Sequence, residues 1–123
     1  NWAHQYNIEG TFSAGADFIA ANVAYVTAKN MKKTVHAGNV LSADIFYNDN
    51  PSGWKNWEKM GVLAVEMESY ALYCNAARLG KKALCILTVS DSFHGSEQLS
   101  SEERQNSVMD MIEVAVETAE KFA

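Results

Sequence analysis

Three acidic residues stand where two apolar segments of the chain end. Glu66 and Glu68 follow the apolar run Gly61–Val65, and Asp91 follows the apolar run Ala83–Val89. Carboxylates accept charge-assisted hydrogen bonds from ligand hydroxyls, and a carboxyl group can act as a general acid or base. Ligands of open α/β sheets bind beyond the carboxyl ends of the strands, so acids in these positions are candidates for a binding or catalytic site.

Each of these acids also has a purely structural interpretation. Glu66 and Glu68 could stabilise the start of a helix, where the dipole favours negative charge, and Asp91 could be a turn or N-cap aspartate. The chain has no P-loop, GxSxG, HExxH or GxGxxG motif. Its histidines show no metal-ligand spacing; they are His4, His36 and His94. From these patterns alone the function stays open.

The elements that must position these acids follow from hydrophobic periodicity. Ile19, Val23 and Val26 recur at i, i+4 and i+7, which predicts a helix over residues 16–33 with these side chains on one face. A β-leaning segment over residues 34–47 and a turn cluster follow. A short helix is predicted over residues 54–60, stopped by a glycine.

The second half of the chain continues the alternation. The two apolar runs, residues 61–65 and 83–89, are typical of buried strands, and a helix to Leu79 lies between them. Ser100 and Glu103 form a capping box that opens a final amphipathic helix. Its expected apolar face consists of Val108, Met111, Ala115, Ala119 and Phe122. Alternating strands and helices indicate an α/β fold with a mostly parallel sheet.

Composition narrows the classes of protein that fit. A chain of 123 residues with 48% hydrophobic and 20% charged content is typical of a soluble globular domain. The net charge of −5 argues against nucleic acid or an anionic membrane as partner. Cys74 and Cys85 lie in apolar runs without CxxC spacing, which favours buried thiols and a cytoplasmic location. Because the chain begins at Asn1 and not at Met, we expect further sequence upstream.

Four segments occur in a characteristic order: Gly38–Tyr47 (GNVLSADIFY), Val62–Tyr73 (VLAVEMESYALY), Leu87–Asp91 (LTVSD) and Ser100–Gln105 (SSEERQ). Together they resemble the C-terminal half of the bacterial hexameric-type purine nucleoside phosphorylases. These belong to the superfamily that also holds uridine phosphorylases. The resemblance implies a three-layer α/β/α fold with a central mixed sheet. Residues 1–123 would then be a single domain or the C-terminal portion of a nucleoside phosphorylase domain.

The resemblance implies a reaction and a set of partners. The reaction is the reversible phosphorolysis of purine ribonucleosides or deoxyribonucleosides to the free base and a pentose 1-phosphate, a pentosyl transfer of purine salvage. Inorganic phosphate is the co-substrate, and no cofactor or metal is expected. The implied partners are a purine nucleoside, phosphate, the N-terminal half of the same protein and further copies of the chain in a hexamer, with no nucleic acid and no membrane.

The resemblance also assigns substrate contacts. Phe46 would pack on the purine, Glu68 would bind the ribose hydroxyls, and Ser90 would lie at the base. The remaining substrate-binding positions flank base and ribose and are Val65, Glu66 and Met67. A carboxylate suits the role of Glu68, because it can accept two hydrogen bonds from vicinal hydroxyls and so fix the sugar.

Asp91 and Arg104 would be the catalytic pair. Asp91 would protonate N7 of the leaving purine, and Arg104 would support that proton transfer. Neutralising the leaving base in this way contributes roughly 10²–10⁴-fold to the rate. For this role Asp91 must hold a proton at neutral pH, so we expect its surroundings to be apolar or crowded.

Two departures from the family pattern leave alternatives open. Family members commonly continue with histidine after the acid, whereas this chain has Ser92 and Phe93 before His94. The phosphate-binding residues of the family lie in its N-terminal half, outside these residues. One alternative is a methylthioadenosine/S-adenosylhomocysteine-type nucleosidase, in which water replaces phosphate; the neighbouring Glu103 and Arg104 favour phosphorolysis. The other is a non-catalytic fragment that needs its N-terminal half.

Overall fold

The computed structural model describes residues 2–95 and 99–122, which divide into two compact units. The first unit consists of the residues up to Asp17 together with Gly38–Leu84. The second consists of Phe18–Ala37 together with the chain from Cys85 onward.

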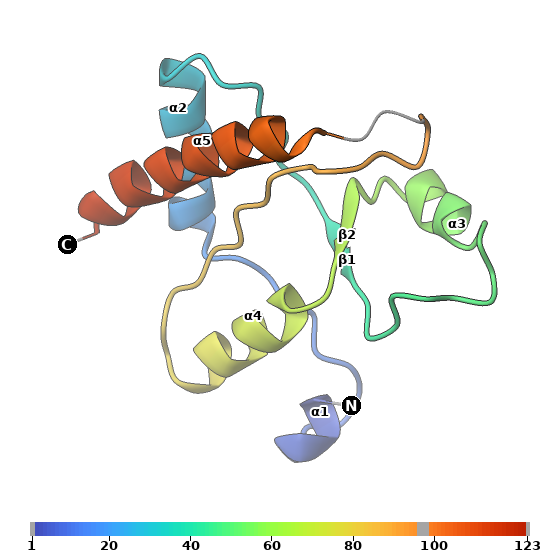
Figure 1. The fold of residues 1–123 in the computed structure, drawn as a ribbon. Helices are drawn as coiled ribbons and strands as arrows, with labels where there is room; N and C mark the ends of the chain where they lie inside the picture. Colours follow the sequence, from blue (N-terminus) through green and yellow to red (C-terminus); the bar gives the residue numbers. More distant parts are fainter. Residues whose placement is uncertain (1, 96–98, 123) are drawn as a thin grey trace. The chain divides into compact units, whose positions relative to one another are not determined.

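The first unit contains the sheet. Strand β1 (Val40–Ser42) pairs in parallel with β2 (Ala64–Glu66), in a register that sets Ser42 opposite Glu66 (Figure 1). The N–H of Leu63 donates to the carbonyl of Asn39 at 2.9 Å and extends the pairing by one step. Parallel strands require a crossover connection, and the short helix α3 (Trp54–Lys59) lies within it. Both strands therefore end on the same edge of the sheet.

Two glycines allow the chain to pass closely around this sheet. Gly61 ends α3 with φ +78°, in the left-handed region that favours glycine, as the sequence predicts. Gly38 precedes β1, and a Cβ added there would lie 2.7 Å from the Cδ1 atom of Leu63. The absence of a side chain at Gly38 therefore lets β1 approach the start of β2.

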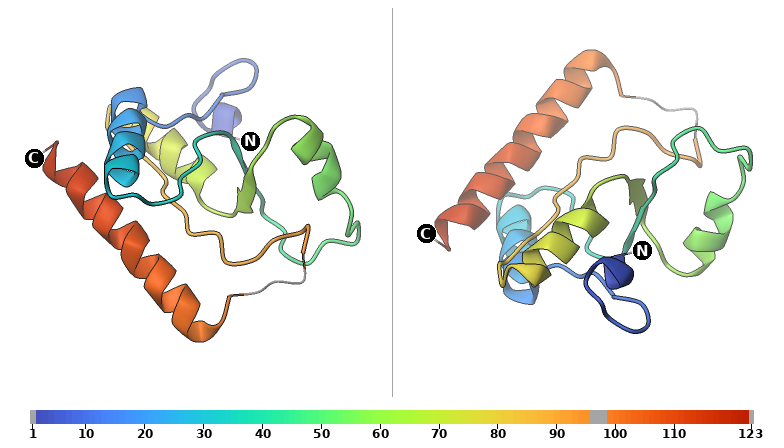
Figure 2. Two further views of the ribbon diagram at one scale, coloured as in Figure 1. Left: turned by 90° about the horizontal axis from the view of Figure 1, so that it is seen from above. Right: turned by 90° about the horizontal axis from the view of Figure 1, so that it is seen from below.

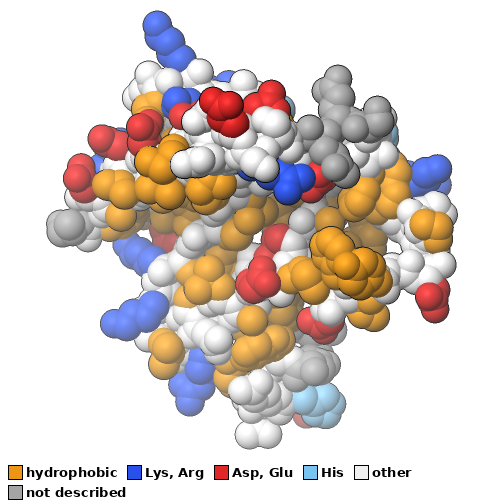
Figure 3. All heavy atoms as spheres, viewed as in Figure 1, with side chains coloured by type: hydrophobic (Ala, Val, Ile, Leu, Met, Phe, Trp, Pro, Cys, Tyr) orange, Lys and Arg blue, Asp and Glu red, His pale blue; other side chains and the backbone are white. Residues whose placement is uncertain are grey.

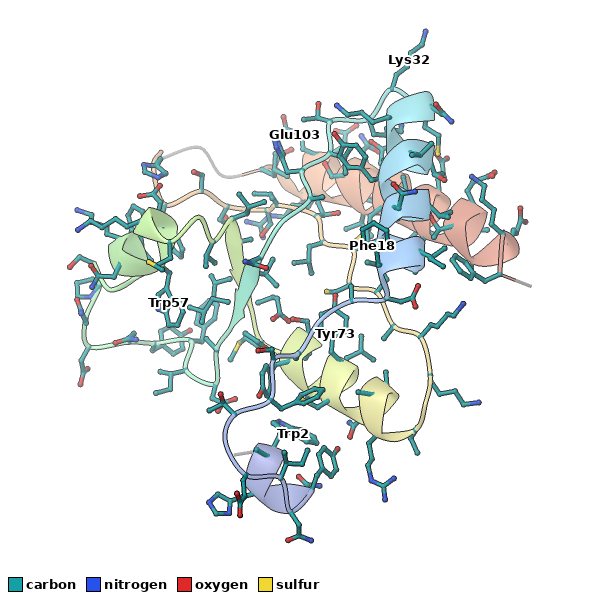
Figure 4. All side chains as sticks on the ribbon, turned by 180° about the vertical axis from the view of Figure 1, so that it is seen from behind. Trp2, Phe18, Lys32, Trp57, Tyr73 and Glu103 are labelled. Carbon is teal, nitrogen blue, oxygen red and sulfur yellow. The ribbon has the colours of Figure 1, made fainter. Side chains whose placement is uncertain are left out.

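Helix α4 (Ser69–Arg78) follows β2 after a two-residue turn and ends before Gly80, as predicted. Its Cys74 side chain is buried, with 1% of its surface exposed. The hydroxyl of Tyr70 donates to the carbonyl of Phe12 at 2.8 Å, which ties the N-terminal segment and its short helix α1 (Trp2–Gln5) to α4. Trp2 and Tyr73 mark these two helices in Figure 4.

In the second unit, α2 (Phe18–Asn30) packs against α5 (Ser101–Glu120), and the two views of Figure 2 show the helices side by side. Lys33 Nζ lies 2.6 Å from Asp110 Oδ1, and Lys121 Nζ donates to Thr27 Oγ1 at 2.9 Å. The buried residues of these two helices are small or β-branched. They are Ala20, Ala24, Thr27 and Ala28 of α2, and Val114 and Thr118 of α5.

Helix α2 confirms the predicted helix, and the residues that it buries are its small ones. Ile19 is 57% exposed and Val26 is also exposed, while the stripe that begins at Ala20 is buried. Small side chains such as these allow two helices to approach closely. In α5, Val108 and Phe122 are exposed and Val114 is buried.

The strand predicted over residues 83–89 is also wrong. These residues carry no regular secondary structure, and the boundary between the two units falls between Leu84 and Cys85. A strand is defined by hydrogen bonds to a neighbouring strand, which a run of apolar residues does not by itself supply. The β-leaning segment over residues 34–47 likewise forms only the short β1.

The chain buries small apolar side chains and leaves many large apolar ones exposed to solvent. The buried apolar residues of the described part are Ala3, Ala20, Ala24, Ala28, Cys74 and Val114. Figure 3 shows hydrophobic side chains exposed on one face, and Phe18, Tyr47 and Met60 are among the most exposed of them. Within the described ranges, no helix has both the length and the apolar character needed to cross a membrane. Helices combined with a parallel sheet confirm the predicted α/β class.

Candidate functional site

The candidate residues of the first unit lie where β2 turns into α4. Val65 and Glu66 are the last two residues of β2, Met67 and Glu68 form the turn, and Ser69 begins α4. Val65 and Met67 are 44% and 39% exposed. The end of β2 and the turn therefore present Val65, Met67 and Glu68 at the carboxyl end of the sheet, where the sequence predicts the acids.

The carboxylate of Glu66 is engaged by the start of α4. Glu66 Oε2 accepts hydrogen bonds from the backbone N–H groups of Glu68 at 2.7 Å and of Ser69 at 2.6 Å. Glu66 Oε1 accepts a bond from the Ser69 hydroxyl at 2.6 Å. Burial raises the pKa of Glu66, but the bonds from Ser69 and Glu68, with a smaller contribution from the Ser42 hydroxyl, outweigh it and hold the pKa below its ordinary value. This side chain satisfies orphan donors of the helix terminus.

The carboxylate of Glu68 is differently placed. Glu68 is the N-cap residue of α4, but its side chain makes no capping bond, and the residue is exposed. Among residues 2–95 and 99–122, no partner for this carboxylate is seen. The carboxylate of Glu68 is thus available to accept hydrogen bonds from a ligand, whereas that of Glu66 already accepts bonds from the protein.

Phe46 lies in the loop after β1 and is 75% exposed. Its ring meets that of Tyr47 edge to face, with centroids 5.0 Å apart and an interplanar angle of 82°. This geometry leaves aromatic surface open to a planar ligand, because an edge-to-face pair does not cover both ring faces.

The candidate residues of the second unit meet at one carboxylate. Arg104 Nη2 lies 3.3 Å from Asp91 Oδ1, and the Ser90 hydroxyl donates to Asp91 Oδ2 at 2.9 Å. The resemblance implied that Asp91 and Arg104 lie together, and the structure brings them together across thirteen positions of sequence. Their catalytic roles stay predictions.

The surroundings of Asp91 differ from the expectation. Its side chain is 53% exposed and that of Arg104 is 48% exposed, so the pair lies in an open and polar place and not in an apolar one. The reason is local: the residues on either side of Asp91, Ser90 and Ser92, are exposed and polar. An exposed ion pair contributes less than about 1 kcal/mol, so a ligand can replace it at small cost.

Arg104 is positioned by the start of α5. The Ser100 hydroxyl accepts a bond from the N–H of Glu103 at 3.1 Å, and Glu103 Oε2 accepts one from the N–H of Ser100 at 2.8 Å. This confirms the predicted capping box. Glu103 is labelled in Figure 4. The pKa of its carboxyl group is lowered chiefly by the hydrogen bond from the Ser100 backbone and secondly by the hydrogen bond with the Ser100 side chain. The N–H of Arg104 bonds to the carbonyl of Ser100 at 2.9 Å, so the box fixes its turn.

Two features were not anticipated from the sequence. Ser69 is a main partner of Glu66, and its signal is a serine three residues after an acid at a strand-to-helix corner. A cavity of about 140 Å³ in the first unit is lined by residues 15–17, Tyr73, Lys81 and their neighbours, and it includes no predicted site residue. In the part of the chain that the structure describes, no group of three acidic, histidine or cysteine side chains is placed to hold a metal ion.

Comparison with known proteins decides the family. The sequence model of the phosphorylase superfamily matches residues 4–123. The chain belongs to the phosphorylase superfamily. This confirms the resemblance carried by the four ordered segments.

Several curated members of the superfamily are close relatives. A DeoD-type purine nucleoside phosphorylase of Clostridium perfringens is 48% identical over 108 residues, which cover 88% of this chain and 46% of the relative. The enzyme of that name from Caldanaerobacter subterraneus is 47% identical over 108 residues, 88% of this chain and 47% of its own. That from Actinobacillus succinogenes is 48% identical over 110 residues, 89% of this chain and 46% of its own. The chain spans about half the length of these relatives.

Proposed function

We propose that this phosphorylase superfamily chain carries the nucleoside-recognising part of a purine nucleoside phosphorylase. The observation that carries the proposal is the identity of 47–48% to three curated enzymes of that name over nearly nine-tenths of the chain. The reaction is a pentosyl transfer in which phosphate attacks C1′ of a purine nucleoside. The glycosidic bond breaks, its electron pair leaves with the base, and the products are pentose 1-phosphate and free purine.

In this proposal Glu68 binds the ribose. Its open carboxylate accepts hydrogen bonds from the two vicinal hydroxyls and holds the sugar while the glycosidic bond lengthens. Phe46 supplies an exposed ring for the purine, and Val65 and Met67 supply apolar contacts. Support comes from the position of these side chains at the carboxyl end of the parallel pair.

Asp91 is the proposed general acid. Its proton passes to N7 of the departing purine, so that a neutral base leaves and not an anion. Ser90 contacts the base, and Arg104 stabilises the carboxylate that forms after the proton has left. The Asp91–Arg104 contact supports this assignment, and exchange of the ion pair for the protonated acid is part of the proposed cycle.

The wider organisation is also a proposal. We propose that residues 1–123 form one domain or the C-terminal portion of a nucleoside phosphorylase domain that completes its phosphate site with other residues. The coverage of about half of each relative and the many exposed apolar side chains support this. A hexameric assembly, a cytoplasmic location, phosphate as co-substrate without a bound cofactor, and no nucleic-acid or membrane partner complete the proposal.

The test is base release by the natural full-length protein, measured with inosine, guanosine and adenosine at saturating and zero phosphate. Release that depends on phosphate and yields pentose 1-phosphate is expected. Equal release without phosphate would instead identify a nucleosidase. Binding of nucleoside without release under either condition would identify a non-catalytic protein. The mass of the natural polypeptide tests the domain proposal separately.

A further inference from the structure

The strand-to-helix corner contains a carboxylate whose hydrogen-bonding capacity is used within the protein. Glu66 Oε2 accepts two backbone N–H groups and Glu66 Oε1 accepts the Ser69 hydroxyl, all within 2.7 Å. Ser69 itself is 4% exposed. Three of the roughly four acceptor directions of this carboxylate are therefore filled by Glu68 and Ser69, which leaves it less able than Glu68 to bind a ligand hydroxyl.

The same residue is anchored on the sheet through its backbone. Ser42 of β1 is its register partner, and the N–H of Ala43 donates to the carbonyl of Glu66 at 2.8 Å. The Ser42 hydroxyl accepts a longer bond, 3.4 Å, from the N–H of Tyr70 in the first turn of α4. Two residues at the ends of the paired strands thus hold the start of one helix.

The backbone of Glu68 takes part in these hydrogen bonds at the start of α4. The N–H of Glu68 donates to Glu66, and its carbonyl accepts the N–H of Leu72 at 3.1 Å. The backbone of Glu68 is therefore held on both sides, while its side chain makes no capping bond. Its carboxylate is free to meet a ligand from a fixed Cα position.

We propose that Glu66 is a positioning residue: its carboxylate fixes the backbone of Glu68 so that Glu68 alone receives the ribose hydroxyls. This rests on the proposed function. It departs from the expectation that Glu66 itself flanks the substrate, and it predicts that the buried Ser69 affects nucleoside binding as strongly as Glu66 does. A preorganised acceptor gains affinity because binding no longer has to order it.

The experiment uses the natural full-length protein and measures KM and kcat for inosine phosphorolysis. Ser69→Ala removes one bond to Glu66, and Glu66→Gln weakens the others. Each is expected to raise KM by about 10-fold with kcat changed less than threefold, the size typical of losing a hydrogen bond to a charged group. Ser69→Thr keeps the hydroxyl and is expected to stay within twofold of the unsubstituted protein. Glu117→Gln, on the exposed face of α5, is the matched control and should change neither constant.

The deciding readout is a double-mutant cycle with Glu68→Gln. If Glu66 acts through Glu68, then Ser69→Ala and Glu66→Gln each add less than twofold to KM once Glu68 is replaced. Effects that multiply in full would overturn the inference, because they would show that Glu66 contacts the nucleoside independently. Should Glu66→Gln fail to fold, the cycle of Ser69→Ala with Glu68→Gln gives the same decision. A protein without phosphate-dependent activity would instead overturn the proposed function.

Discussion

At the starts of α4 and α5, backbone N–H groups are hydrogen-bonded by the same two residue types, glutamate and serine, in opposite order along the chain. At α5, Ser100 is the N-cap and Glu103 lies inside the first turn, so the two side chains exchange bonds with each other's backbone. At α4, the acid comes first: Glu66 belongs to a strand, and Ser69 is the first helical residue. Each start lies next to a proposed site residue, which is Arg104 within α5 and Glu68 just before α4.

The difference lies in what each cap depends on. The α5 box closes within Ser100–Glu103 and needs no other part of the protein. The α4 cap uses a carboxylate whose backbone is set by the register between β1 and β2. The position of Arg104 is thus fixed locally, whereas that of Glu68 is fixed by tertiary structure. Substitutions at the two starts should therefore affect catalysis in different ways.

The largest effect is expected at the carboxylate that pairs with Arg104. Asp91→Asn in the full-length protein should lower kcat for adenosine by about 10²–10⁴-fold, the usual contribution of a general acid. An amide still donates a hydrogen bond to a 6-oxo purine but has no carboxyl proton to give, so the loss with inosine should be smaller. Steady-state kinetics with both nucleosides measures this. An equal loss for both would count against protonation at N7.

A smaller effect is expected from the cap of α5. Ser100→Ala removes the N-cap acceptor and should lower the free energy of unfolding by about 1 kcal/mol. Because Arg104 lies in the capped turn, kcat should fall more than KM rises, the reverse of Ser69→Ala at α4. Urea unfolding and steady-state kinetics measure the two quantities, and Ser100→Asp, which retains an acceptor, is the control. If Ser100→Ala changed only KM, the start of α5 would act on substrate binding as the start of α4 does, and the proposed difference between them would be wrong.

The smallest effect concerns pH. Glu66 and Glu103 both have pKa values below the ordinary value of their side chain, so the unfolded state binds more protons and stability rises with pH. The contribution of each is complete above the unfolded value, about 4.3, and is lost as pH falls through the lower folded value. Glu66→Gln should flatten the decline of the urea midpoint between pH 5 and pH 3. Glu103→Gln, at a solvent-exposed cap, should flatten it less; an equal change would show that burial does not distinguish the caps.

The parts of the fold that sequence reasoning predicted are those with local causes. The α5 box, the stop of α3 at Gly61 and the corner after Val65 each depend on residues a few positions apart, and the structure confirms them. The errors concern long-range contacts. Residues 83–89 form no strand because apolar content does not specify a pairing partner, and the segment predicted over residues 34–47 forms only the three residues of β1.

The site shows the same division. The meeting of Asp91 and Arg104 followed from the family resemblance, although the open surroundings of the pair did not. The two acids of the Glu66–Glu68 corner were recognised together, but the sequence does not indicate which of them the helix would engage. That depends on Ser69 and on the register with Ser42, and both are contacts that only the folded chain creates.

The parallel pairing of β1 with β2 has one more consequence, for how such proteins can vary. The register is held at the strands and by the N–H groups of Ala43 and Leu63, while the loop over residues 44–53, between β1 and α3, includes the exposed Phe46. Doubling the length of a flexible connection costs only about 0.6 kcal/mol in closure entropy. The segment that carries the aromatic ring can therefore lengthen, shorten or change its sequence at little thermodynamic cost, while the acidic corner keeps its geometry.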